Sequence, residues 1–276
     1  MEEISVQRIT KALGLERKIV GVKIIPYKKE FEEVKEEQIT GKMSFCAMVN
    51  KASEGVAVKA DISNFGCTGG ARALGVMPTT EATRSGRHYC ASGLYGSYAI
   101  ARNVNEHMQY IPYHNFGVLA APLEEMSEAD SVIIIANARQ VMRIMQGYAH
   151  QFGAPEHLNA FGNQAMCADL VSKPIMNNDI NVSFMCRGAR FFGKCDDGEM
   201  GVGFPIQFME QLTTGIITTM NVVETNAVKQ EILERLNDPE ELGLPVIMDL
   251  NYPTNVAKYQ RYSEEMEEYE RNSTDK

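Results

Sequence analysis

The chain has 276 residues, with a hydrophobic fraction of 44% and a charged fraction of 23%, as expected for one large globular domain or two closely packed halves. Its formal net charge of −9 argues against the basic surface that nucleic acid or anionic lipids require. No apolar run is long enough to span a bilayer, and residues 1–17 lack the apolar core of a signal peptide. We therefore expect a cytoplasmic protein that binds neither nucleic acid nor membranes.

The six cysteines and sixteen methionines indicate whether the protein works in an oxidising or a reducing environment. Disulfides are rare in the cytoplasm, so the cysteines are expected to remain thiols, metal ligands or a nucleophile. Many exposed methionines would be vulnerable to oxidation, which favours an anaerobic source.

Hydrophobic patterning predicts strands and helices that alternate along the first half of the chain. The predicted order is a helix over 4–15, a strand over 18–26, a charged helix over 28–39, a helix over 41–55 that carries Cys46, a strand over 56–62, a Cys-Gly turn with a short helix, and a strand over 116–122. Residues 76–112 are polar, aromatic and rich in glycine, and they predict a long irregular insertion.

The second half repeats this order. A strand and an amphipathic helix over 131–153 are followed by a predicted helix over 159–174 that carries Cys167 and by a strand that begins at Asp179. A second Cys-Gly turn comes next, and then a strand that ends at Pro205 and leads into a helix. A helix over 225–239, a loop and short strand over 241–253, and an acidic, partly disordered tail complete the prediction.

A short phrase occurs once in each half. "DISNFGCTGGARALG" spans 61–75 and "DINVSFMCRGARFFG" spans 179–193. Together with the repeated order of strands and helices, it indicates an internal duplication. We expect an α/β fold with an N-terminal helix (1–17), a first half (18–125) that contains the insertion 76–112, a second half (131–212) related to it by a pseudo-twofold axis, and a C-terminal helix and acidic tail (213–276).

Four cysteines occupy matching places in the two halves. Cys46 and Cys167 lie in predicted helices, and Cys67 and Cys186 lie in the Gly-rich turns. A pseudo-twofold axis would bring all four together, and four thiolates are the ligand set of an iron–sulfur cluster or a tetrahedral zinc ion. Their wide spacing and the absence of Cys-x-x-Cys favour a cluster shared between the halves, most simply [4Fe–4S]. The alternatives are zinc, or buried thiols that hold no metal.

Other side chains are candidates for roles around this site. Arg72 and Arg190 follow the turn cysteines and are expected to stabilise a bound cluster or anion, or else to pair with Asp61 or Asp179. His88, Tyr89 and Tyr95 of the insertion are candidate substrate-binding residues, whether the insertion is a lid or a dimer arm. Cys90 and Cys195 have no counterpart in the other half; Cys90, close to His88, is an alternative reactive thiol.

Three motifs carry a resemblance to a known family: "FGCTGGARALG", the cysteine of "QAMC", and "CRGAR" followed by "DDGEMGVGFP". On these motifs, residues from about 18 to 212 resemble the DUF169 proteins of archaea and anaerobic bacteria. The resemblance implies cysteines at the places of Cys46, Cys67, Cys167 and Cys186 and implies no established reaction.

These observations lead to three alternative functions. The first is a redox or electron-transfer protein whose four cysteines hold an iron–sulfur cluster and which acts with a redox partner protein or on a small-molecule substrate. The second is a non-redox enzyme or ligand-binding protein with structural or zinc-binding cysteines. The third is an interaction subunit, in a homo-oligomer or a larger complex, that uses the insertion as an arm.

Overall fold

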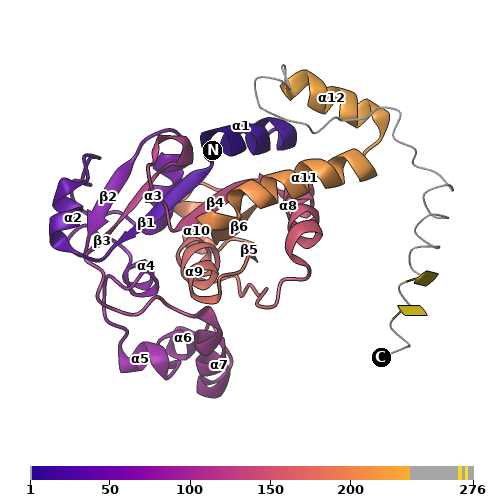
Figure 1. The fold of residues 1–276 in the computed structure, drawn as a ribbon. Helices are drawn as coiled ribbons and strands as arrows, with labels where there is room; N and C mark the ends of the chain where they lie inside the picture. The colour runs from indigo at the N-terminus through magenta and orange to yellow at the C-terminus, as the bar shows by residue number, and fades with distance from the viewer. Residues whose placement is uncertain (1, 237–266, 269–270, 273–276) are drawn as a thin grey trace.

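The computed structural model describes residues 2–236, 267–268 and 271–272. The predicted short strand over 241–253 and most of the predicted acidic tail lie outside the described residues. The described chain forms one mixed sheet-and-helix unit, which confirms the predicted α/β fold class (Figure 1). None of its helices is both long and apolar enough to cross a membrane.

The sheet has six strands in the order β2-β3-β1-β4-β6-β5. All neighbouring pairs are antiparallel. The first half provides β1 (Val20–Ile25), β2 (Val58–Asp61) and β3 (Gly117–Pro122), and the second half provides β4 (Ser131–Asn137), β5 (Asn181–Ser183) and β6 (Glu199–Pro205).

The strand order is the same when it is followed outward from the central β1–β4 pair in either direction. In each half, the first residue of the central strand pairs with a proline that ends the neighbouring strand: Val20 with Pro122, and Ser131 with Pro205. This is the order that two halves related by a pseudo-twofold axis would have. The duplication itself stays a prediction, which superposition of the two halves would test.

The two Asp-Ile phrases do not occupy equivalent places. Asp61 is the last residue of β2, whereas Asp179 precedes β5. The cysteines that follow are equivalent, because Cys67 and Cys186 each precede the first residue of a short helix, α4 (Thr68–Ala73) and α10 (Arg187–Phe191). The predicted equivalence of the two phrases at their aspartates is therefore wrong. The phrases occupy equivalent places in the fold only at their cysteine-containing turns.

The cysteine-bearing helices cover one face of the sheet. This layer contains α3 (Phe45–Ser53), α4, a π-helix η2 (Ala165–Ser172), α9 (Lys173–Asn177) and α10. Alternate strand residues, such as Ile133 and Ile135, point into the core beneath these helices. The intervening residues, such as Val132 and Ile134, point to the opposite face.

The opposite face is covered by helices that contain no cysteine. They are α1 (Glu2–Leu13), α2 (Lys28–Glu33), α8 (Ala138–Phe152), α11 (Met209–Val223) and α12 (Asn226–Leu236), with short 3-10 turns η1 (Leu123–Glu125) and η3 (Ile206–Phe208). The predicted helix over 28–39 is too long, because α2 ends at Glu33. The buried ammonium of Lys59 donates hydrogen bonds to the carbonyls of Phe31 and Val34 and so satisfies the end of this helix.

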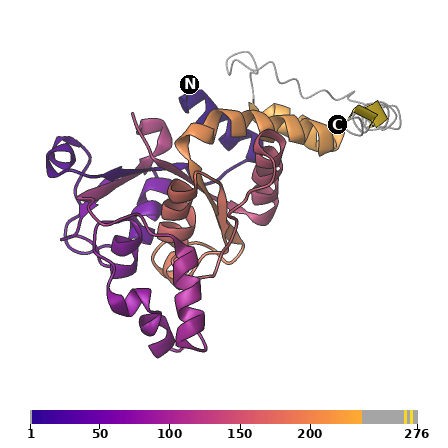
Figure 2. The ribbon, with the colours of Figure 1, turned by 60° about the horizontal axis from the view of Figure 1, so that its bottom comes forward.

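Residues 76–112 are largely helical, so the predicted irregular loop is wrong. They form α5 (Glu81–Arg84), α6 (Arg87–Ala91) and α7 (Tyr98–Met108), which pack on one another and project as a lobe at one end of the molecule (Figures 1 and 2). Thr80 and Ser97 accept hydrogen bonds from the first turns of α5 and α7. These caps define where the two helices begin.

The π-helix η2 lies directly on the sheet because β6 has no side chain beneath it. A Cβ atom at Gly203 would lie 2.1 Å from the carbonyl oxygen of Leu170, and one at Gly201 would lie 2.3 Å from the Leu170 side chain. The hydroxyl of buried Ser131 donates to the same Leu170 carbonyl, at 3.1 Å. The "GVG" of β6 therefore determines how close the helix that carries Cys167 comes to the sheet.

Candidate functional site

The four cysteines with matching places in the two halves come from four helix beginnings on one face of the sheet. Cys46 is the second residue of α3, whose first turn is capped by the Ser44 hydroxyl. Cys167 lies in the first turn of η2, and Cys67 and Cys186 are the N-cap residues of α4 and α10. Cys46 and Cys167 are buried, Cys186 is half-buried, and Cys67 is exposed.

The thiols associate across the two halves. The S–H of Cys46, from the first half, donates a hydrogen bond to the sulfur of Cys186, from the second half. A Cβ atom at Gly188 would lie 3.6 Å from both sulfur atoms. On the other side, α4 packs on η2 as α10 packs on α3, and Cys67 and Cys186 both raise the pKa of Cys167. Each helix cysteine therefore lies near the turn cysteine of the opposite half, and Cys167 also interacts with Cys186 of its own half.

The surroundings of three of these thiols shift their pKa values in different directions. The hydrogen bond to Cys186 and burial raise the pKa of Cys46 well above its usual value. Burial and the neighbouring Cys67 and Cys186 do the same to the pKa of Cys167. The hydrogen bond from Cys46, with backbone N–H groups of Ala165, Ala189 and Gly188, outweighs burial and lowers the pKa of Cys186 to about 5.

The thiols interact electrostatically without forming a preassembled metal centre. Within the described part of the chain, no three histidine, cysteine or acidic side chains are grouped tightly enough to hold a metal ion. The chemistry of four thiols still fits an iron–sulfur cluster, which binds each cysteine through a different iron and so separates the sulfurs more than a single zinc ion does. Cluster binding would require Cys46 to lose its proton and move away from Cys186.

A network of phenol and amide groups from the insertion lies against the cysteines. Tyr89 accepts a hydrogen bond from the Gln164 amide, and its ring contacts that of Tyr95 edge-on at 5.9 Å between centroids. The Asn163 amide donates to the Tyr95 hydroxyl at 3.5 Å. Tyr110, at the end of the insertion, interacts with Tyr89 and Gln164, and burial raises its pKa strongly. The insertion is thus joined to the start of η2.

Gln164, Asn163 and Tyr110 belong to this site and were not predicted from the sequence. Gln164 precedes η2 in a left-handed conformation, with φ of 53°, and its Oε1 atom is buried without a hydrogen-bond partner. Strained backbone of this kind often occurs at functional sites. Nothing in the spacing of these residues indicates their proximity, because packing of the insertion brings them together.

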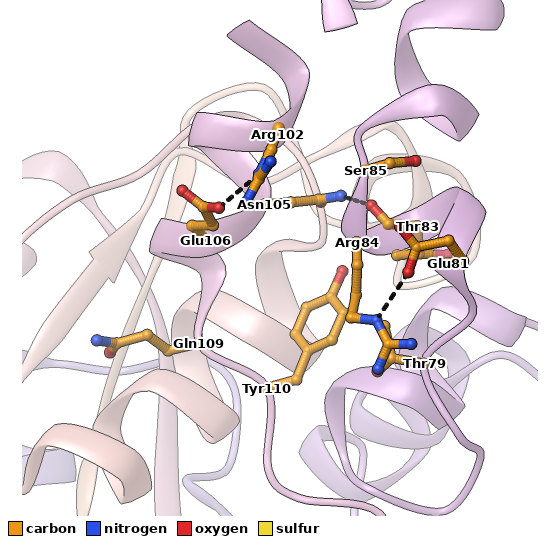
Figure 3. Close-up of a pocket in the computed structure, with 10 residues that line it drawn as sticks. All are labelled: Thr79, Glu81, Thr83, Arg84, Ser85, Arg102, Asn105, Glu106, Gln109 and Tyr110. Atoms are coloured by element: carbon orange, nitrogen blue, oxygen red, sulfur yellow. Dashed lines mark hydrogen bonds and ion pairs between the residues drawn. The ribbon is translucent and has the colours of Figure 1, made fainter. Parts of the chain in front are cut away.

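Two cavities border the insertion. One, of about 440 Å³, lies between α6 and α10 and is lined by His88, Tyr89 and Cys186 among others. The larger, of about 510 Å³, lies within the insertion between α5 and α7 (Figure 3). Tyr110 lines the larger cavity, whose two arginines pair with Glu81 and Glu106. The smaller cavity is the one that Cys186 borders.

The two candidate arginines have local partners. Arg190 donates to the carbonyls of Phe184, at 3.0 Å, and Asp196, which holds together the turns on either side of α10. Arg72 donates to the Thr68 hydroxyl at 3.4 Å. Among the described residues, neither arginine forms an ion pair with Asp61 or Asp179, so that alternative is wrong.

The two remaining cysteines have no counterpart in the other half. Burial, with smaller contributions from Glu199 and Cys186, raises the pKa of Cys195 to about 11. Cys90 and His88 are two residues apart on α6, a spacing at which helical side chains point in different directions, so the two do not form a nucleophile–base pair.

Comparison with known proteins identifies the family. The model of DUF169, described as "Uncharacterised ArCR", matches residues 8–215. The uncharacterized protein MJ0308 of Methanocaldococcus jannaschii is 24% identical over 213 residues, which cover 76% of this chain and 91% of that protein. No solved structure matches. The chain therefore belongs to the DUF169 family.

Proposed function

We propose that the chain binds an iron–sulfur cluster, most simply [4Fe–4S], between its two halves through Cys46, Cys67, Cys167 and Cys186. Its role would be redox chemistry or electron transfer in anaerobic metabolism in the cytoplasm, with a redox partner protein or a small-molecule substrate. The observation that carries this proposal is the association of the thiols across the halves, Cys46 with Cys186 and Cys167 with Cys67.

The surroundings of the thiols support the proposal chemically. A bound cluster would supply one-electron transfer at this position. The backbone N–H groups of Ala165, Gly188 and Ala189 that reach Cys186 would offset negative charge on its thiolate. Burial of Cys46 and Cys167 would keep water from half of the ligand set, while Cys67 and Cys186 lie on the accessible side. Arg190 would hold the turn that carries Cys186.

The insertion would provide the second component of the site. His88, Tyr89 and Tyr95 are proposed to contact a substrate, because His88 and Tyr89 line the cavity that Cys186 borders and Tyr95 packs on Tyr89. The packing of the insertion against η2 favours a lid over a dimer arm.

A second candidate is a non-redox enzyme or ligand-binding protein with structural or zinc-binding thiols. It is favoured by the absence, within the described residues, of a tight group of metal-binding side chains. In that case Cys186, already ionised near neutral pH, would face the cavity as a free thiolate.

Analysis of iron, sulfide and zinc in anaerobically purified protein separates the two candidates. The cluster proposal expects about four iron and four sulfide per chain, with broad visible absorption that bleaches on reduction. One zinc per chain without sulfide would replace the cluster with a structural site. Protein that contains neither metal, and that takes up no cluster on anaerobic reconstitution with iron and sulfide, would contradict both metal-bound forms.

A further inference from the structure

The cavity between α6 and α10 differs in charge from the rest of the molecule. The chain has 36 acidic residues, yet none of the residues that line this cavity carries a carboxylate. Each of four other cavities in the described part of the chain includes at least one glutamate. The negative charge at this lining is therefore limited to the Cys186 thiolate, which backbone N–H groups of Ala165, Gly188 and Ala189 stabilise, in a protein whose net charge is −9.

Arg187 supplies a positive charge that no carboxylate among the described residues pairs with. It lines the cavity, is exposed, and has no hydrogen-bond or ion-pair partner among the described residues. By contrast, Arg17 binds Glu199 at 2.6 Å and Arg102 binds Glu106 at 2.8 Å. The planar guanidinium of Arg187 is thus free to bind a carboxylate through two hydrogen bonds.

The rest of the lining indicates an anion with an organic body. His88 and the Asn163 amide add polar groups, while Leu94, 53% exposed, and the ring of Tyr89 provide apolar surface. The volume of about 440 Å³ lies in the range of small-molecule sites. A bare inorganic ion would leave most of this space and the apolar surface unused.

We propose that this cavity binds a small organic carboxylate, with its oxygens on Arg187 and its carbon skeleton against Tyr89 and Leu94. This rests on the proposed function in that it names the substrate class of the same site. The carboxylate would lie beside Cys186. Arg187 then becomes the residue that determines specificity for an anion.

Calorimetric titration of the purified protein with benzoate, and with its uncharged isostere benzamide, tests the proposal. Benzoate is expected to bind at least about tenfold more tightly than benzamide, because a bidentate charge-assisted pair is lost in the amide. The Arg187→Gln variant should lose that preference, and Arg187→Lys should retain only part of it. The matched control is Arg87→Gln, which removes the same charge from an exposed residue of α6 outside the cavity lining and should change the affinity less than twofold.

Several outcomes would overturn the proposal. They are equal binding of benzoate and benzamide, no saturable benzoate binding, unchanged affinity in a folded Arg187→Gln variant, and binding of inorganic phosphate or sulfate in place of benzoate. Iron analysis of the same samples separates this result from the cluster proposal. Arg187-dependent benzoate binding by protein that acquires no iron would support the carboxylate site and contradict the cluster. Iron-loaded protein that does not bind benzoate would do the reverse.

Discussion

Cys46 donates its S–H to the sulfur of Cys186, and the two residues come from opposite halves of the chain. The donor lies in the first turn of α3 and the acceptor precedes α10, so the pair exists only when these helices pack together. The hydrogen bond from Cys46 and three backbone N–H groups favour the ionised form of Cys186 and lower its pKa to about 5. If the site binds the proposed cluster, its binding would therefore be coupled to folding and to the protonation of these thiols.

Replacing any one of the four cysteines by serine should lower cluster content. We expect iron and sulfide to fall to less than about half in Cys46→Ser, Cys67→Ser, Cys167→Ser and Cys186→Ser, because the thiolate is the ligand that iron–sulfur clusters require. Cys90→Ser and Cys195→Ser are the matched controls and should retain wild-type iron. Iron analysis of anaerobically prepared variants is the measurement, and equal loss in the controls would contradict the four-ligand assignment.

Cys186 should be the thiol that reacts at the lowest pH in metal-free protein. Its pKa of about 5 predicts that alkylation by iodoacetamide rises with a midpoint near pH 5, as the thiolate forms. Cys46 and Cys167, buried and with raised pKa values, should stay unlabelled up to pH 9. Peptide mass spectrometry after timed labelling identifies each site.

The variant Cys46→Ala provides the control for that experiment. It removes the hydrogen bond that contributes most to lowering the pKa of Cys186, so the midpoint should move to higher pH. A midpoint that stays near pH 5 would mean that the backbone N–H groups alone are sufficient, and a wild-type midpoint near 9 would contradict the hydrogen-bonded arrangement.

Gly203→Ala should displace the helix that carries Cys167. The new methyl group would overlap the Leu170 carbonyl. We therefore expect the free energy of unfolding to fall by about 1–3 kcal/mol and the cluster content to fall with it. Gly198→Ala is the matched control, because a Cβ atom there meets nothing within 4 Å. Urea denaturation and iron analysis measure the two effects, and similar values for both variants would contradict a packing role for Gly203.

Asp179→Asn should reduce the dependence of stability on acid pH. Burial favours the protonated form of Asp179, but hydrogen bonds from Tyr148 and from the backbone N–H groups of His157, Ile180 and Glu156 outweigh it and lower the pKa. Because the folded-state pKa lies below the unfolded value of 3.8, this stabilisation is fully present above about pH 4 and is lost as the pH falls through the folded pKa.

Urea denaturation between pH 3 and 7 measures this effect. The variant should be less stable than wild type by about 1–3 kcal/mol at pH 5–7, and the difference should shrink below pH 4. Tyr148→Phe, which removes one of the donors, should reproduce part of the effect. A difference that stays constant down to pH 3 would contradict the assignment.

Local pattern was sufficient for much of the sheet. The strands that end at Pro122 and Pro205, and the buried run that begins at Ser131, were predicted near their observed bounds. A proline that closes an apolar segment, or a run rich in isoleucine and valine, signals a strand without reference to the rest of the chain. The α/β class and the four cysteines of interest follow from the same kind of information. Each of these conclusions depends on residues that are neighbours in sequence.

Tertiary contacts decided the rest. The buried ammonium of Lys59 accounts for the early end of α2. The glycines of β6 and the hydrogen bond from Ser131 hold residues 165–172, which form a π-helix within the predicted helix over 159–174, close to the sheet. The equivalence of the Asp-Ile phrases was wrong because Asp61 and Asp179 bind different partners: the amide and hydroxyl of Ser63, and the hydroxyl of Tyr148.

The sequence by itself determined that each half carries one cysteine in a helix and one in a Gly-rich turn. Only the folded chain decided that each meets the turn or helix cysteine of the opposite half, and that Gln164 and Tyr110 lie against them. The physical reason is that hydrophobic periodicity reports the face that a helix buries. Which side chains then meet depends on how closely two backbones approach, and that distance is set by residues from distant parts of the chain.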